Sequence, residues 1–428
     1  MARTMKDSGI EWIGMIPENW KQYHFKYIIS AKIDNRGRTP TLNEDNIGIP
    51  IIELNAIGTK NPNVKNVSKF ISKESYDKFI RNDLLAGDVL FGTVGSIGKC
   101  SIVPEGVNYC IAQNIVGYRF NLENDPLYWY FYFGSDAFKL SFMQYNKGNV
   151  LSSIKISDME RATMVVPPLS EQQKIAKFLD EKIGEIDTIL SKTRESIEEY
   201  KKYKNAVVAE TITKGLDKTV TMKESGIEWV GKIPSHWEVH TLSQVFMQLK
   251  NKNSDLSETN LLSLSYGKIK RKDINSSDGL LPESFDGYNV IDKNDIVLRL
   301  TDLQNDHKSL RVGHVKERGI ITSAYVTLRC KEEIATDYYY YFLHTFDIYK
   351  GFYGMGAGVR QGLNYEGIRS MKILSPDIKE QQEIVEYLNA KCAEIDALIA
   401  KKEAFVQEME TYKKSLIYEY VTGKKEVV

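Results

Sequence analysis

The amino-acid sequence predicts a mixed α/β fold, in which two similar globular domains are joined by two long helices that pair as an antiparallel coiled coil. Three observations lead to this prediction. One segment of sixteen residues occurs twice, a helical segment with a narrow apolar stripe occurs twice, and the intervening residues alternate short apolar runs with glycine turns. The chain has 428 residues, which is enough for two or three domains.

The first repeat opens each half of the chain. The segment MKDSGIEWIGMIPENW at Met5–Trp20 returns as MKESGIEWVGKIPSHW at Met222–Trp237, with 11 of 16 positions identical. A match of this quality does not arise by chance, so the chain is interpreted as two copies of one unit with a pseudo-two-fold internal repeat.

The second repeat closes each half and has the pattern of a long helix. The segment at Pro167–Leu190 is answered by the segment at Ser375–Ile399. Ser170 and Asp377 each stand three residues before a glutamine or glutamate, which is the spacing of a capping box. Each helix is expected to run for about 45 residues, or roughly 65 Å.

Apolar residues recur along both helical segments at alternating spacings of three and four, which is typical of a coiled-coil seam. The predicted seam residues are Ile186, Leu190, Ile197, Val207, Ile395, Ile399, Val406 and Leu416. Two like helices bury such a stripe most simply against each other, and the alternative is that each stripe packs on its own domain. An antiparallel pair with one domain near each end agrees with the order of the chain.

The residues between the repeats are expected to form mixed α/β domains. Asp88–Gly95 and Cys100–Gly106 are predicted strands, and Asp295–Asp302 and Tyr325–Cys330 are expected to take their places in the second copy. The aromatic-rich runs that follow predict helices whose rings belong to the core, with a base-stacking platform as the alternative. The predicted segments are a first domain at 1–166, a central helix at 167–216, a second domain at 217–374 and a C-terminal helix at 375–428.

Composition restricts the classes of function. Lys+Arg and Asp+Glu are both 57, so the formal net charge is zero, whereas a stand-alone nucleic-acid binder is usually basic. The four cysteines contain no C-x-x-C pair and are expected to be free thiols, with a disulfide or zinc site as the alternative. The sequence contains neither an apolar run long enough for a membrane span nor the core of a signal peptide, so a cytoplasmic protein without a membrane partner is predicted.

The sequence contains no convincing catalytic or metal-ligating pattern. GTVGSIGK at Gly92–Lys99 lacks the first glycine and the final hydroxyl of a phosphate-binding loop. The DPLY segment resembles the Asp-Pro-Pro-Tyr box of amino-methyltransferases, but it lacks the second proline and a preceding glycine-rich loop for S-adenosylmethionine. His236 and His240 are spaced as metal ligands, but Asn19 and Tyr23 hold these positions in the first copy. The chain is therefore not expected to be an enzyme or to bind a metal.

The duplicated opening motif SGIEW-GxIPxxW and the duplicated closing helix, EQQKIA-FLD-K--EID in its first copy, resemble the specificity subunit of type I restriction–modification enzymes over essentially the whole chain. The resemblance implies that each variable domain is a target-recognition domain that reads one half of a bipartite, asymmetric target in double-stranded DNA. It also implies that the coiled coil sets the spacer and docks two modification (methyltransferase) subunits, which restriction (endonuclease and translocase) subunits join. S-adenosylmethionine, ATP and magnesium are expected on those partners and no cofactor on this chain. Two other hypotheses remain, a stand-alone DNA adenine methyltransferase and a coiled-coil scaffold without a DNA function.

The resemblance further implies that loops of the variable domains contact DNA. Basic and polar residues in glycine-rich, turn-like settings are the candidates, with solvated loop residues as the alternative. The predicted DNA-binding residues are Gly95, Ser96, Lys99, Lys147, Asn149, Ser152, Ser153, Arg299, Lys308, Arg311, Arg360, Gln361 and Asn364.

Overall fold

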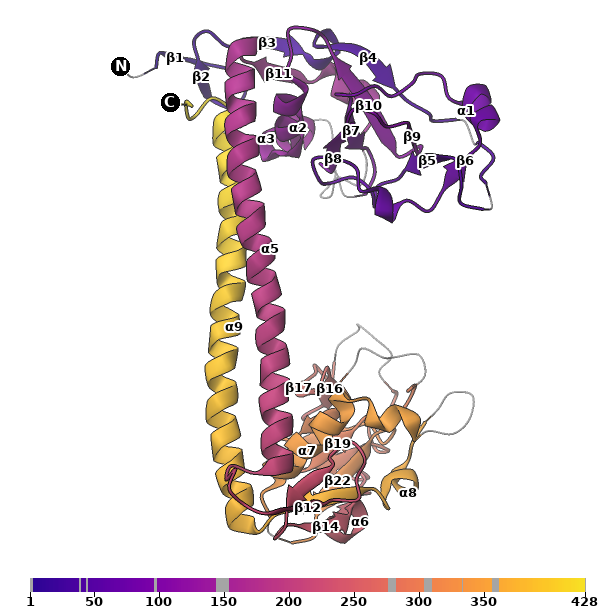
Figure 1. Ribbon diagram of the computed structural model, residues 1–428, viewed down its shortest axis with the longest axis vertical. Coiled ribbons are helices and arrows are strands. Elements are labelled where there is room, and N and C mark those ends of the chain that lie inside the picture. The colour runs from indigo at the N-terminus through magenta and orange to yellow at the C-terminus, as the bar shows by residue number, and fades with distance from the viewer. Residues whose placement is uncertain are drawn as a thin grey trace. The chain divides into compact units, whose positions relative to one another are not determined.

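The chain divides into two compact units (Figure 1). The first unit combines Met1–Arg194 with Ala404–Val428, and the second unit is Glu195–Glu403. Each unit therefore holds one globular domain and a part of both long helices. The structure is a computed structural model that describes residues 3–37, 40–43, 45–95, 98–143, 154–275, 282–303, 310–332, 334–355 and 362–427.

The repeated opening motif forms a small hairpin at the start of the first unit. Strand β1 (Met5–Asp7) pairs with β2 (Met15–Pro17), and β3 (Lys21–His24) then pairs with β11 (Thr163–Val166), both in antiparallel fashion. Strand β11 ends just before the first long helix, so this second pair ties the opening of the repeat to its close.

An antiparallel sheet and an aromatic helix form the core of the first domain. The strand order is β4-β10-β7-β8, and the elements are β4 (Ile29–Ile33), β7 (Val89–Gly92), β8 (Cys100–Ile102), β10 (Ile115–Phe120), α2 (Pro126–Gly134), α3 (Asp136–Met143) and α4 (Ile156–Arg161). Asp125 caps α2 by accepting hydrogen bonds from the backbone N–H groups of Leu127 and Tyr128. The predicted helix and its buried aromatic rings are confirmed, because Trp129 and Phe133 lie in the same core as Phe91.

The outer part of the first domain has a different sheet. Strand β5 (Ile49–Ile52) pairs in parallel with β9 (Cys110–Ile111) and in antiparallel with β6 (Phe70–Ile71), and helix α1 (Lys73–Phe79) follows β6. Separate small cores lie beneath these strands and do not merge with the aromatic core.

The second domain repeats the frame of the first. Its hairpin pairs β12 (Met222–Glu224) with β13 (Lys232–Pro234), and β14 (Glu238–Thr241) pairs with β23 (Lys372–Ser375). Its main sheet has the order β15-β22-β19-β20 and is followed along the chain by the aromatic helix α7. The elements are α6 (Leu242–Val245), β15 (Phe246–Gln248), β16 (Leu262–Ser265), β17 (Lys268–Arg271), β18 (Asn289–Ile291), β19 (Ile296–Leu298), β20 (Val312–His314), β21 (Gly319–Ile321), β22 (Val326–Cys330), α7 (Thr336–Ile348) and α8 (Tyr365–Ile368).

The matching sheets correct one predicted equivalence. Tyr325–Cys330 does contain strand β22, but β22 lies beside β19 where β10 lies beside β7 in the first domain. The counterpart of β8 is therefore β20, not β22. A short apolar run predicts a strand but not its neighbour in the sheet, which is why the sequence assigned the wrong partner.

The predicted long helices are confirmed as α5 (Leu169–Lys214) and α9 (Ile378–Val421). The predicted cap at Asp377 is also confirmed, since its carboxylate accepts a hydrogen bond from the backbone N–H of Glu380 at 3.0 Å. The predicted cap at Ser170 is wrong, because α5 already begins at Leu169. Within the described residues, no helix is both long and apolar enough to cross a membrane.

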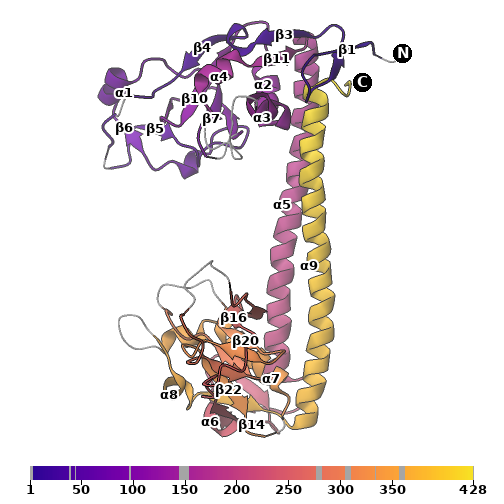
Figure 2. The same ribbon diagram turned by 180° about the vertical axis from the view of Figure 1, so that it is seen from behind.

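Within each unit α5 and α9 lie side by side in both views (Figures 1 and 2). In the first unit, Lys413 forms an ion pair with Asp187. In the second unit, Lys204 forms an ion pair with Asp396 at 2.6 Å. These two ion pairs are equivalent in the repeat, since Lys204 and Lys413 interrupt the apolar stripe at the same position.

The two opening motifs are held in place by contacts with the long helices. Trp20 and Trp237, the last residues of the two opening motifs, are fully buried. The indole N–H of Trp20 donates to Glu171 at 3.0 Å, and that of Trp237 donates to Glu380 at 2.8 Å. Each tryptophan therefore fastens an opening motif to the first turn of a closing helix.

Further repeated contacts fasten each domain to the end of the other helix. The hydroxyl of Tyr128 donates to the carbonyl of Val421 at 2.9 Å, and that of Tyr338 donates to the carbonyl of Ile212 at 3.0 Å. These hydrogen bonds satisfy carbonyl groups that have no intrahelical partner at a helix end. The same residue types thus build the same junction in both units.

Candidate nucleic-acid interface

The turn between β7 and β8 is the predicted DNA-contacting site that the structure describes best in the first unit. Gly95 is exposed and has a φ of 74°, a left-handed conformation that favours glycine. Lys99 is exposed at the end of the same turn. Backbone and ammonium groups on such a tip suit contacts to a phosphate chain.

Arg311 is placed differently from what the sequence predicted. It is fully buried, and its guanidinium donates to the carbonyls of Arg299 and Thr301 at 3.1 and 2.8 Å. It also donates to the Tyr353 hydroxyl at 3.1 Å. This side chain supports the loop after β19 from inside and is not accessible to a ligand, because all of its accessible surface is already covered.

The other described candidates of the second unit lie at the ends of elements. Arg299 directly follows β19 and is half-buried. Asn364 is exposed, but its side chain caps α8 by accepting a hydrogen bond from the backbone N–H of Gly367 at 3.0 Å. The remaining candidates lie outside the described residues, and they are Ser96, Lys147, Asn149, Ser152, Ser153, Lys308, Arg360 and Gln361.

A basic hairpin in the second unit was missed as a candidate. Strands β16 and β17 pair in antiparallel register, with the exposed Tyr266 at the turn between them. Side chains alternate along a strand, so Lys268 and Lys270 share one face of β17 while Ile269 packs on a small core on the other. These residues appear in the sequence as KIKRKD. Without knowledge of the strand, the two exposed lysines could not be distinguished from an ordinary run of solvent-exposed charges.

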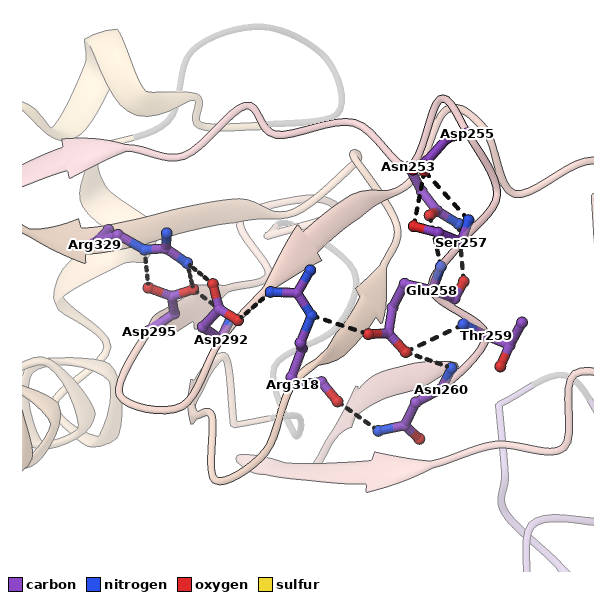
Figure 3. A network of polar contacts seen from close by, with 10 residues as sticks. All are labelled: Asn253, Asp255, Ser257, Glu258, Thr259, Asn260, Asp292, Asp295, Arg318 and Arg329. Carbon is purple, nitrogen blue, oxygen red and sulfur yellow. Dashed lines mark hydrogen bonds and ion pairs between the residues drawn. The ribbon is translucent and has the colours of Figure 1, made fainter.

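Ion pairs between a half-buried arginine and a buried aspartate hold the strand ends from which these loops depart. In the second unit, Arg329 donates to Asp295 at 2.7 Å and also to Asp292, which binds Arg318 as well (Figure 3). The two carboxylates raise the pKa of Arg329, chiefly through the hydrogen bond to Asp295. The guanidinium therefore stays charged and keeps the turn before β19 fixed.

Among its described residues, the first unit repeats the inner part of this network. Arg119 binds Asp88 through two hydrogen bonds of 2.8 Å, and Asp88 is fully buried before β7. In the second unit the network continues outward, because Arg318 also binds Glu258 at 3.1 Å (Figure 3). The pair between an arginine and a buried aspartate therefore belongs to the frame that both units share, whereas the extension through Arg318 belongs to a part of the second unit that differs from the first.

The predicted seam residues are covered by the rest of the protein to different degrees. Ile186, Leu190, Ile197, Ile395, Ile399 and Leu416 are buried, and Val207 and Val406 are half-buried. In the first unit Ile186 and Leu190 share a core with Leu416, while Val406 packs against it. Ile186, Leu190 and Leu416 therefore belong to one apolar core, to which the first globular domain also contributes.

The long helices have two flanks, one on each side of the predicted seam, and the two flanks carry different kinds of side chain. On the flank one residue after the seam, Asp180 binds Lys60 of the first domain at 2.7 Å, and Asn389 accepts a hydrogen bond from Tyr341 of the second domain at 2.8 Å. The flank one residue before the seam carries large exposed apolar side chains, namely Ile189, Phe405 and Tyr412 in the first unit and Tyr203 and Leu398 in the second. We call this second surface the apolar flank.

The residues considered as metal ligands and redox groups have other roles where the structure describes them. His236 binds Glu380 at 2.9 Å and His240 binds Glu238 at 2.9 Å. The four cysteines are free thiols, and burial raises the pKa of Cys100 to about 12. Among the described residues, no group of three or more histidine, cysteine or acidic side chains is arranged to hold a metal ion.

Comparison with known sequences identifies the kind of domain. The family model for the type I restriction modification DNA specificity domain matches residues 17–199 and 234–407. The chain is 24% identical over 424 residues to the MjaX specificity subunit of Methanocaldococcus jannaschii, covering 96% of this chain and 95% of that protein. It is also 26% identical over 382 residues to the type I restriction enzyme MjaVIII specificity subunit of the same organism, covering 83% and 82%.

Solved structures have the same fold at low sequence identity. A chain from a study of complex assembly and conformational transition of the type I R-M system superposes with a TM-score of 0.70 at 13% identity, covering 96% of this chain and 99% of that one. The HsdS subunit of Thermoanaerobacter tengcongensis superposes with a TM-score of 0.51 at 13% identity, covering 96% and 98%.

Proposed function

This chain belongs to the family of type I restriction modification DNA specificity domains, and from that premise we propose that its two domains read the two halves of a bipartite, asymmetric DNA target. Specificity subunits are non-catalytic, so the chain is the DNA-specificity component of a type I restriction–modification complex. The proposed reading modules are the segments 1–166 and 217–374.

One observation carries the proposal of two separate readers. The same frame is built twice, down to the Trp20–Glu171 and Trp237–Glu380 hydrogen bonds, while the outer parts of the two domains have different strands. Identical frames hold two readers in equivalent positions, and different outer parts recognise different bases. This arrangement suits a target whose halves are unlike.

The DNA contacts are assigned to the outer loops. The Gly95–Lys99 turn is the proposed contact of the first domain, and the loop after Arg299 together with Lys268 and Lys270 is that of the second. Lysines on exposed turns contact phosphates and position the duplex, whereas base edges in the major groove give specificity. The buried Arg311 is proposed to shape the loop without touching DNA.

The two long helices are proposed to form an antiparallel coiled coil that sets the spacer between the half-sites. The equivalent ion pairs Asp187–Lys413 and Asp396–Lys204 support this, since an antiparallel pair related by a pseudo-two-fold axis requires the same contact twice. Deleting one heptad from each helix keeps the seam and shortens the pair by about 10 Å, or about three base pairs. A folded deletion variant should prefer a shorter spacer, and an unchanged spacer preference would reject this role.

The apolar flank is the proposed docking surface for two modification subunits. Tyr203 and Tyr412 occupy equivalent positions of the repeat, as do Ile189 and Leu398, and all four are exposed. Two equivalent apolar patches suit two copies of one partner. Tyr203→Lys and Tyr412→Lys should each cause the loss of one modification subunit from the complex, which native mass spectrometry can measure.

Mapping of modified bases tests the proposal as a whole. DNA from a host that expresses the chain with its modification subunits should carry methylated bases at one two-part target, separated by a fixed spacer. The purified chain alone should transfer no methyl group from labelled S-adenosylmethionine. Methyl transfer by the isolated chain would favour the methyltransferase hypothesis, and the absence of any modified target would favour a scaffold.

A further inference from the structure

The turn of the β16–β17 hairpin holds a tyrosine in a backbone conformation that this residue type avoids. The strand register pairs Ser265 with Lys268, so Tyr266 and Gly267 are the two central residues of the turn. Their φ values are positive, 47° and 75°. Two successive positive values are the mark of a type I′ turn, in which asparagine followed by glycine is preferred. A bulky residue is an outlier at the first of these positions, and holding it there costs free energy.

The rest of the domain offers the tyrosine ring little in return. The side chain of Tyr266 is 71% exposed. Among the described residues, it makes no hydrogen bond and no contact with another ring. Strained residues are concentrated at binding sites, where the ligand gives a reason for the strain. The exposed ring is therefore expected to contact a ligand.

The hairpin holds the ring in a fixed place. On its apolar face, Leu264 and Ile269 pack so closely on Gly313 of β20 that a Cβ atom at Gly313 would lie 2.6 and 2.8 Å from their methyl groups. At the tip, the backbone N–H of Gly267 donates to the carbonyl of Leu310 at 3.0 Å. The turn is therefore supported from two sides, and the ring stands on a base that resists being pushed back.

The surroundings of the ring are basic. Lys268 and Lys270 are exposed, and neither has an ion pair among the described residues. Leu310, which holds the turn, lies in the same connection between β19 and β20 as Arg299, another proposed DNA contact. An aromatic ring beside free ammonium groups suits a polyanion that also offers flat apolar faces. Duplex DNA has both features, and its major groove admits a two-stranded ribbon.

We propose that Tyr266 inserts its ring between neighbouring base pairs of the half-site that the second domain reads. The ring stacks on the face of one base, while Lys268 and Lys270 hold nearby phosphates. Inserted side chains unstack a base step, and the free energy that this requires depends on how easily the step deforms. Tyr266 thereby adds specificity without a hydrogen bond to a base edge. The proposal rests on the proposed function, because DNA is the expected ligand.

Three variants separate this role from a structural one. Tyr266→Phe keeps the ring, whereas Tyr266→Asn removes it and places the preferred residue in the turn. Tyr266→Asn should therefore have an equal or higher midpoint of denaturation than the unchanged chain, so a loss of DNA binding could not come from misfolding. Tyr27→Asn removes a ring that is 63% exposed from the first domain and is the control.

The first experiment measures the binding of the complex between the full-length chain and its modification subunits to a duplex with the mapped target and to an unrelated duplex. Tyr266→Asn should weaken binding to the target about tenfold. Tyr266→Phe and Tyr27→Asn should change it less than twofold. Binding of Tyr266→Asn to the unrelated duplex and the salt dependence should stay the same, because phosphate contacts determine both.

The second experiment locates the insertion with fluorescent analogues of adenine and cytosine, placed in turn at each base pair of the target. The fluorescence of one step should change on binding. This change should be lost in Tyr266→Asn and kept in Tyr266→Phe. A base that is extruded for methylation also changes its fluorescence, but that signal should not depend on Tyr266.

Three results would overturn the inference. Equal losses of affinity for target and unrelated DNA, with a lower salt slope, would make Tyr266 part of a phosphate contact. Loss of a modification subunit from the DNA-free Tyr266→Asn complex would place the ring at a protein interface. Unchanged binding of Tyr266→Asn to the target would leave the ring without a base to contact. In each case an intact two-part methylation pattern of the unchanged protein would leave the proposed function standing, whereas absence of that pattern would reject the function itself.

Discussion

The two globular domains have the same inner frame and different outer parts. In both, the four-stranded sheet, the hairpin of the opening motif and the aromatic helix are arranged alike. Outside this frame, the first domain has the parallel pair β5–β9 and helix α1, whereas the second has the basic hairpin β16–β17 and the pair β18–β21. The two copies are therefore alike in their inner frame and differ in their outer parts.

The side-chain ion pairs are likewise divided into those that both domains share and those that they do not. The Asp88–Arg119 and Asp295–Arg329 pairs occupy equivalent places in the two sheets. In the second domain the network also continues outward through Arg318. The frame uses repeated buried contacts, and the outer parts use contacts that occur once.

The largest effect is expected from the repeated tryptophans. Trp20→Ala and Trp237→Ala should each lower the free energy of unfolding of their own unit by about 3–5 kcal/mol, since both side chains are fully buried. Hydrogen exchange should show the loss in the unit that carries the change. Trp→Phe variants keep most of the packing and lose the hydrogen bond to Glu171 or Glu380, so they should cost less. If the losses of stability at Trp20 and Trp237 were very different in size, the frames of the two units would not be equivalent.

A smaller effect, confined to the second unit, is expected from the buried arginine. Arg311→Met should lower the free energy of unfolding of this unit by about 2–4 kcal/mol, because carbonyl groups of the loop after β19 lose their charged donor. The salt dependence of DNA binding should not change, since Arg311 touches no phosphate. A lower salt slope with unchanged stability would instead identify it as a DNA contact.

The second domain should also be more sensitive to acid. Burial lowers the pKa of His344 to about 4, and the nearby Lys204 contributes in the same direction. Below about pH 6.5 the unfolded chain binds a proton that the folded chain does not, so stability is lost as the pH falls from 6.5 towards 4. The expected loss at pH 5 is about 1–2 kcal/mol. Denaturant unfolding should show it, and His344→Phe should remove it.

The smallest effect is expected on the basic hairpin. Lys268→Ala and Lys270→Ala should each weaken binding of the assembled complex to all DNA sequences equally and lower the salt slope by about one. Arg271→Ala is the matched control, because this side chain already pairs with Glu317 and should contribute less. Unchanged binding in both lysine variants would place the hairpin away from the duplex.

The sequence predicted local elements better than the contacts between elements. The long helices and the aromatic helices follow from periodicity and capping, because these patterns are local. The pairing of β22 with β19 and the burial of Arg311 depend on contacts distant in sequence, which no local pattern contains. The same limit explains why the two outward-facing lysines of the KIKRKD segment were not identified from the sequence.

Exchange of one variable region is the sharpest test of whether the two domains read the DNA independently. Residues 238–374 are replaced with the corresponding region of another specificity subunit, and modified bases are mapped in DNA from a host that expresses the hybrid with its modification subunits. If the two domains read independently, one half of the target changes, while the other half and the spacer stay the same. A change in both halves, or in neither, would contradict two independent readers on a common frame.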